Sequence, residues 1–253
     1  MTDVVATEAL TEDERMVLLA ARELRDGETC FVGVGVPSLA AMLAKRTHAP
    51  DLVLIYESGA IDADPPQPPL STGSPSIVAN TSMLGSCLDV FASLQSGDMD
   101  CGLLSGAQVD RYGNLNSTVI GDYAAPRLRM VGSGGAHDIT TLAKRYVIVM
   151  PHDPRRIVER VDFVTSPGLI GPGNEREKLG LPGGGPECLV TPRARFSFEA
   201  GELTLNGQCP GVAEDEAVEG FSWEVPRAGT LCELLPFDED AIRELRETIM
   251  PPD

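Results

Sequence analysis

The chain has 253 residues and a formal net charge of −18 at pH 7, with 42% hydrophobic and 23% charged residues. A protein with this much negative charge repels nucleic acid and anionic membrane surfaces. We therefore expect neither of them as a partner. No apolar run reaches the roughly 20 residues of a membrane-spanning helix. The acidic, polar first fifteen residues do not resemble a secretory signal, which predicts a cytoplasmic protein.

Six cysteines are spread along the chain, and none of them forms a C-x-x-C pair with another. Zinc sites are commonly built on such pairs, so no metal site is expected. A chain of this size without an export signal is better explained by reduced, mostly buried thiols than by disulfides.

The first sixty residues alternate between helical and extended patterns. Thr11 and Glu14 form a T-x-x-E capping box, which predicts that a helix begins there. The elements expected in this part are a helix over 11–26, a strand over 29–34, a helix over 38–46 and a strand over 52–56. This alternation favours a parallel sheet covered by helices.

The remaining residues extend the same pattern and then change it. We expect helices over 83–94, 212–220 and 238–248, strands over 101–105, 144–150 and 156–165, and irregular segments over 63–76 and 166–186. Residues 187–206 carry two or three short strands that are typical of a hairpin. There is no internal repeat and no long linker, so 1–253 is predicted to be one α/β domain with a small antiparallel section near the C-terminus.

Three glycine-containing segments follow predicted strands: VGVGVP (32–37), YESG (56–59) and VGSGGAHD (131–138). Ligands of open α/β sheets bind at the carboxyl ends of strands, where glycine N–H groups can hold a phosphate or an oxyanion. The first segment lacks the third glycine of the G-x-G-x-x-G dinucleotide motif, because position 38 is serine. Each segment alone also fits a plain turn between a strand and a helix.

Glu57 is the sharpest candidate for chemistry because it directly follows the apolar run LVLIY. A carboxylate at the mouth of a buried strand loses part of its water shell, which makes it a better nucleophile or base. Gly59 leaves room for a bulky electrophile beside it. The alternative is that Glu57 caps a turn or pairs with an arginine, and the residues alone leave both possibilities open.

The stretch SGAQVDRYGNLNSTVIGDY (105–123) is dense in amides and hydroxyls between apolar strands. Such a composition suits either a network that holds turns or a pocket that binds a ligand.

The sequence resembles the β subunit of family I coenzyme A transferases, and within that family the glutaconate CoA-transferase type. The resemblance is carried, in chain order, by YESGAID, SGAQVDRYGNLNSTVIGDY, RMVGSGGAHDI, KRYVIVMPHD, VDFVTSPG and EREKLGLPGGGP. It implies an open α/β/α, mostly parallel sheet related to the ribose-phosphate isomerase class. It also implies an α-subunit partner, often in an α2β2 assembly, with the active site between the subunits.

The resemblance further implies a ping-pong reaction in which Glu57 forms a γ-glutamyl-CoA thioester. Its substrates would be an acyl-CoA and a carboxylic acid, either glutaconate or a related dicarboxylate or 3-oxo acid, and no cofactor would be permanently bound. The candidate oxyanion donors are the backbone N–H groups of Gly134, Gly135 and Ala136. The candidates for orienting the thioester or Glu57 are Gln108, Asn114 and Asn116.

Two other functions stay open. Some relatives on this fold decarboxylate an alkenyl-dicarboxyl-CoA or hydrolytically open a ring on a CoA thioester. These relatives tend to replace the β-subunit glutamate, so the presence of Glu57 favours transfer. A desolvated Glu57 could nevertheless activate water. A non-catalytic, interaction-only subunit is the third possibility, because a fold alone does not fix an activity.

Overall fold

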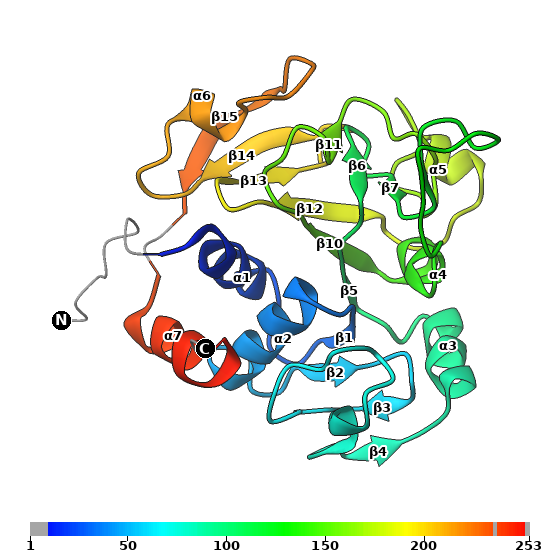
Figure 1. The fold of residues 1–253 in the computed structure, drawn as a ribbon, viewed down its shortest axis with the longest axis vertical. Helices are drawn as coiled ribbons and strands as arrows, with labels where there is room; N and C mark the ends of the chain where they lie inside the picture. The colour runs from blue at the N-terminus through cyan, green and yellow to red at the C-terminus, as the bar shows by residue number, and fades with distance from the viewer. Residues whose placement is uncertain (1–9, 235–236, 251–253) are drawn as a thin grey trace.

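The computed structural model describes residues 10–234 and 237–250 (Figure 1). Ten strands in this part of the chain form one sheet, in the order β15-β14-β13-β12-β10-β5-β1-β2-β3-β4. They are β1 (Thr29–Val32), β2 (Val53–Ile55), β3 (Ala60–Ile61), β4 (Met83–Leu84), β5 (Cys101–Leu104), β10 (Arg145–Val149), β12 (Pro186–Val190), β13 (Ala194–Ser197), β14 (Thr204–Gln208) and β15 (Arg227–Glu233). The sequence predicts one domain over residues 1–253. Part of that range, including most of the acidic N-terminal residues, lies outside the described residues.

The centre of the sheet is parallel, as predicted. Strand β1 pairs in parallel with β2 and β5, and β10 pairs in parallel with β5 and β12. The predicted antiparallel section near the C-terminus is β12-β13-β14. Because β2 and β5 lie on opposite sides of β1, the strand order reverses at β1, which is where open α/β sheets bind ligands.

Helices cover both faces of the sheet and make three layers. On one face lie α1 (Glu12–Arg22), α2 (Val36–Arg46), α7 (Glu239–Glu244) and the π-helical turn η3 (Leu245–Ile249), and on the other lie α3 (Cys87–Ser96) and α4 (Ala136–Leu142). Side chains along β1 alternate between the two cores: Cys30 and Val32 pack with the first group, and Phe31 packs with the second. No helix in the described ranges is long and apolar enough to cross a membrane.

Smaller elements flank these layers. They are β6 (Gln108–Asp110), β7 (Leu115–Asn116) and β11 (Ile157–Val158), which form one sheet, β8 (Val119–Ile120) and β9 (Leu128–Arg129), which pair with each other, and the short helices η2 (Pro75–Val78), α5 (Glu175–Lys178) and α6 (Glu214–Ala217).

The capping box that predicts the first helix is confirmed. The Thr11 hydroxyl accepts a hydrogen bond from the Glu14 N–H, and the Glu14 carboxylate accepts one from the Thr11 N–H. The helix ends at Arg22 and not at residue 26, since the residues before Gly27 form a turn in front of β1.

Several predicted boundaries were wrong, mostly where elements are very short. The helix predicted over 83–94 begins at Cys87, because Ser86 and Asp89 form a capping box there and Met83–Leu84 pairs with β3. Of the strand expected over 156–165 only β11 forms, and the helix expected over 212–220 is the single turn α6. Strand β15 was not predicted.

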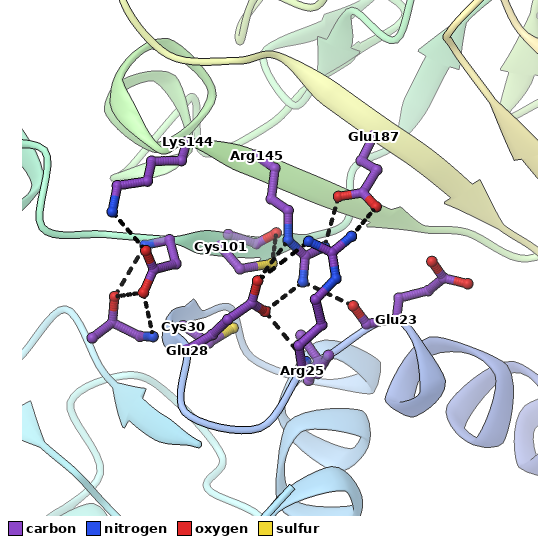
Figure 2. Close-up of polar contacts among 12 residues, drawn as sticks. Glu23, Arg25, Glu28, Cys30, Cys101, Lys144, Arg145 and Glu187 are labelled. Atoms are coloured by element: carbon purple, nitrogen blue, oxygen red, sulfur yellow. Dashed lines mark hydrogen bonds and ion pairs between the residues drawn. The ribbon is translucent and has the colours of Figure 1, made fainter. Parts of the chain in front are cut away.

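A buried charge cluster aligns the amino ends of the central strands (Figure 2). Arg145, the first residue of β10, is only 9% exposed. Its guanidinium donates to Glu28 Oε1 and Oε2 at 3.1 and 2.5 Å, to Glu187 Oε2 at 3.0 Å and to the Glu23 carbonyl at 2.8 Å. Glu28 directly precedes β1 and Glu187 lies in β12, so one side chain joins strands on both sides of β5.

We expect Arg145→Met to lower the free energy of unfolding by about 3 kcal/mol, because it leaves mostly buried carboxylates without their main partner. The loss should be at the low end for buried pairs, since Arg25 also contacts Glu28 and Glu187. Urea unfolding of the variant measures it.

The adjacent Lys144→Met is the matched control. The Lys144 side chain is 61% exposed and pairs with Asp100 at 2.7 Å, so its removal should leave the free energy of unfolding almost unchanged. Equal losses for the two variants would contradict a special role of the Arg145 cluster.

Candidate active site

Glu57 lies in a tight turn at the carboxyl end of β2. The turn is closed by hydrogen bonds from the Gly59 N–H to the Tyr56 carbonyl and from the Tyr56 N–H to the Ala60 carbonyl, both 3.0 Å long. Gly59 has φ +109°, and a Cβ atom there would lie 2.2 Å from the Gly85 carbonyl oxygen. The Gly85 N–H also donates to the Gly59 carbonyl at 2.8 Å. Only glycine allows these two backbones to pack so closely. The space at Gly59 is therefore filled by the Gly85 backbone, and the expectation that it leaves room for an electrophile was wrong.

The Glu57 carboxylate is half-buried and makes no hydrogen bond or ion pair with any residue that the structure describes. It faces the backbone of Gly135: a Cβ atom built there would lie 3.5 Å from the Glu57 Cδ and Oε2 atoms. The same Cβ would lie 3.0 Å from Cζ of Phe91, whose ring packs edge-on against Phe31. Within the described chain, the carboxylate is thus neither a turn cap nor an arginine partner, and it is available for chemistry.

The turn formed by Gly134 and Gly135, here called the glycine turn, lies beside Glu57 and directly precedes helix α4. Gly134 has φ +49°, and the Gly135 carbonyl accepts the first helical hydrogen bond from the Ile139 N–H at 3.0 Å. The N–H groups of Gly134 and Gly135 have no acceptor among the described residues. The Ala136 N–H already donates to the Ser133 carbonyl at 3.0 Å. Two of the three predicted oxyanion donors are therefore unpaired within the described chain, and the third would have to exchange its partner.

The three predicted orienting residues are buried and bonded to the chain itself. Gln108, Asn114 and Asn116 are 6%, 1% and 0% exposed. The Asn116 amide donates to Gln108 Oε1 and to the Val119 carbonyl, both at 2.7 Å. The Asn114 side-chain carbonyl oxygen accepts from the Gly168 N–H at 2.8 Å. These contacts match the turn network that the sequence left open, and a direct role in binding substrate stays a prediction.

This network supports the glycine turn from behind. Asn116 Oδ1 accepts from the Thr118 N–H at 3.0 Å, and the Thr118 and Thr165 hydroxyls lie 2.7 Å apart. The Ser117 hydroxyl donates to the Gly132 carbonyl at 2.7 Å, and the Gly132 N–H returns a bond to the Ser117 carbonyl at 2.9 Å. The segment 116–118 thus sets the position of the residues that lead to Gly134 and Gly135.

Sequence reasoning missed two side chains of this region, Phe91 and Thr165. Phe91 is one apolar residue of a helix that has several, so nothing in its pattern marks it as a neighbour of Glu57. The Thr165 hydroxyl accepts a hydrogen bond of 2.9 Å from the Ser117 N–H, and the two residues are 48 positions apart in the chain. The polar pair T-S before Pro167 was the only local signal for it.

Comparison with known proteins shows which family the chain belongs to. Residues 14–182 match the family model described as Coenzyme A transferase. The chain belongs to the coenzyme A transferase family. It is 40% identical over 241 residues to the B subunit of the 3-oxoadipate CoA-transferase of Pseudomonas knackmussii, covering 94% of this chain and 93% of that one. It is 37% identical over 254 residues to the B subunit of the glutaconate CoA-transferase of Acidaminococcus fermentans, covering 95% and 93%.

The crystal structure of glutaconate CoA-transferase from Acidaminococcus fermentans has the same fold. It matches with a TM-score of 0.88 and 32% identity over 98% of this chain and 96% of the other. The predicted fold class and the predicted β subunit of a family I CoA-transferase are both confirmed. Structures of the decarboxylase AibA/AibB match with TM-scores near 0.80 but at 24% identity, so they show a shared fold and no more.

We expect Gly59→Ala to slow CoA transfer about tenfold or more, because the new methyl group must push the Glu57 turn away from Gly85. The loss in unfolding free energy should combine about 1–2 kcal/mol for a positive φ with about 1–3 kcal/mol for the clash. Steady-state rates and urea unfolding give the two quantities.

Gly27→Ala separates these causes. Gly27 also has a positive φ, +75°, but a Cβ atom there meets nothing within 4 Å. This variant should lose only the backbone contribution and keep its transfer rate within about twofold. If Gly59→Ala transfers CoA as fast as Gly27→Ala, the packing of Gly59 on Gly85 does not position Glu57.

Proposed function

We propose that Glu57 is the covalent nucleophile of an acyl-CoA:carboxylate CoA-transferase. The observation that carries the proposal is its carboxylate, which lies at the end of β2 against the Gly135 backbone and is unpaired within the described chain. A carboxylate that forms no ion pair has its oxygen atoms free to attack an electrophile, and the half-buried position limits the number of water molecules around them.

In the proposed first half-reaction, a Glu57 oxygen attacks the thioester carbonyl of the donor acyl-CoA. The C–S bond breaks, and an acyl-glutamyl anhydride and the CoA thiolate result. The thiolate then attacks the γ-carbonyl of Glu57, which releases the donor acid and leaves a γ-glutamyl-CoA thioester. The acceptor acid reverses both steps and leaves as its CoA thioester, with the Glu57 carboxylate restored.

Each addition in this scheme places negative charge on a carbonyl oxygen. The N–H groups of Gly134 and Gly135 are the proposed donors to that oxygen, because both are unpaired within the described chain and Gly135 faces the Glu57 carboxyl. Ala136 can act as a third donor only if its N–H gives up its hydrogen bond to the Ser133 carbonyl. The scheme requires no resident cofactor, since coenzyme A enters and leaves as part of the substrates.

The acid is proposed to be a dicarboxylate of the glutaconate or 3-oxoadipate kind. Support comes from the two relatives whose enzymes are named for these acids, which are 37% and 40% identical to this chain. Glutaconate and 3-oxoadipate both carry a second carboxylate, and 3-oxoadipate is in addition a 3-oxo acid. A cytoplasmic location fits this chemistry and stays a prediction.

The partner is proposed to be an A-type subunit that covers the Glu57 face, in an α2β2 or similar assembly. Support comes from the relatives, which are named as B subunits, and from exposed apolar side chains on the two segments that meet the Glu57 turn. Leu84 and Leu88 are 63% and 77% exposed and flank Gly85, which contacts the Glu57 turn. Val131, beside the glycine turn, is fully exposed. Such a group of exposed apolar residues is typical of a surface that another chain covers.

The alternative is a decarboxylase or hydrolase acting on a CoA thioester, with Glu57 activating water. Fold similarity to AibA/AibB keeps it open. It lacks support from the relatives at 37% and 40% identity, which are named as subunits of CoA-transferases.

The deciding experiment uses the chain co-purified with its A-type subunit and a panel of acyl-CoAs. Borohydride reduces a glutamyl-CoA thioester to a primary alcohol, which peptide mass spectrometry locates. We expect the modified peptide to carry the change on Glu57 and to appear without any acceptor acid. Glu57→Gln keeps the shape but cannot attack, so it should lose the adduct and at least about 10³-fold in rate. Consumption of acyl-CoA without an adduct or an acceptor would instead favour hydrolysis or decarboxylation.

For the subunit surface, we expect Leu88→Asp to abolish co-purification with the A-type subunit, since it places a charge in an apolar contact. Size-exclusion chromatography of the co-expressed pair reports it. Leu179→Asp is the control, because Leu179 is similarly exposed, at 61%, but it directly follows α5, whose Arg176 binds the carbonyls of Thr140 and Thr141 and not the Gly134–Gly135 turn. An intact Leu88→Asp complex would place the contact elsewhere.

A further inference from the structure

A buried hydrogen bond lies directly behind the Glu57 turn. The Tyr56 and Ser38 hydroxyl oxygens are 2.8 Å apart, and the two residues are 0% and 1% exposed. Tyr56 is the residue before Glu57. Ser38 lies in the first turn of α2, just after the Gly33–Gly35 segment that leaves β1. The bond therefore joins the carboxyl ends of two adjacent parallel strands.

The alternation of side chains puts the two neighbouring residues on opposite faces of the sheet. Tyr56 packs in the core beneath α1 and α2, whereas Glu57 faces Gly135 and Phe91 on the side of α3 and α4. The backbone N–H and carbonyl of Tyr56 both bond within the turn, to Ala60 and Gly59. The Tyr56 ring thus anchors, from the far side, the same peptide segment that carries the Glu57 carboxylate.

The hydroxyl is the informative part of this side chain, because a phenylalanine would fill the same apolar space. A buried hydroxyl is costly unless it is hydrogen-bonded, and here the only bond described for it is to Ser38. Burial also raises the pKa of Tyr56 to about 12, so the phenol keeps its proton and stays neutral over the working pH range.

We infer that Tyr56 and Ser38 are positioning residues of the reaction: their hydrogen bond fixes the Glu57 turn relative to the end of β1. The inference rests on the proposed role of Glu57 as the nucleophile. A bond that holds the attacking group matters most for the step in which that group reacts, since small displacements at a nucleophile can cost up to about 100-fold in rate.

The test measures the rate of Glu57 thioester formation by rapid mixing with acyl-CoA, in the complex with the A-type subunit. Tyr56→Phe and Ser38→Ala should each slow this step about tenfold while KM changes less than about twofold. The double variant should be no slower than either single variant, because both remove the same bond. Two additive losses would overturn the inference.

Tyr146→Phe is the matched control. The Tyr146 hydroxyl is also fully buried and lies within hydrogen-bond distance of the Pro167 and Gly113 carbonyls, at 3.1 and 3.4 Å, but Tyr146 lies on β10 and has no hydrogen bond to the Glu57 turn. This variant should lower the melting temperature by an amount similar to Tyr56→Phe and keep thioester formation within about twofold.

The outcomes separate this inference from the proposed function. If the wild-type complex forms no Glu57 thioester, both are overturned. If the wild type forms it and Tyr56→Phe forms it equally fast, or if Tyr146→Phe is slowed as much, only the positioning role is overturned. Ser38→Ala breaks the same hydrogen bond from its other end, so it keeps the test decisive should Tyr56→Phe fold poorly.

Discussion

The buried ion pairs of Arg145 are the constraint on which the arrangement of the sheet depends. One guanidinium binds the residue before β1 and a residue of β12, so the amino ends of strands on both sides of β5 are held at one level (Figure 2). Strands that start at one level and run parallel bring their carboxyl ends to a common edge. The ion pairs of Arg145 lie at the amino ends of the central strands, and Glu57 lies at the opposite, carboxyl ends.

At that edge the site is built from backbones in close approach. Gly59 lies against Gly85, so a side chain at Gly59 would displace the Glu57 turn. Gly135 lies against the Glu57 carboxyl, so a side chain there would crowd the carboxylate itself. Such close backbone contacts tolerate little displacement, so the segments that make them must also be held in position. The polar network of Gln108 and Asn116 supplies that support under the glycine turn.

The sequence predicted the features that depend on local signals. The capping box at Thr11 and the strand that ends before Glu57 belong to this class, because a few adjacent residues determine each. Met83–Leu84 becomes a strand only because β3 lies beside it, so its own two residues carried no signal. The partners of Asn116 include Thr165, 49 positions away, so the sequence could not distinguish a turn network from a ligand pocket.

The geometry around Glu57 also bears on where selectivity for the acid would arise in the proposed reaction. In that reaction this chain would supply Glu57, apolar side chains such as Leu88, and the N–H groups of Gly134 and Gly135, which have no acceptor among the described residues. The charged residues closest in sequence to the Glu57 turn, Asp62 and Asp64, are acidic. A dicarboxylate needs a cation or several donors for its second carboxylate, and like charges repel it. On the proposed assembly, the A-type subunit is therefore the place to find the group that distinguishes one acid from another.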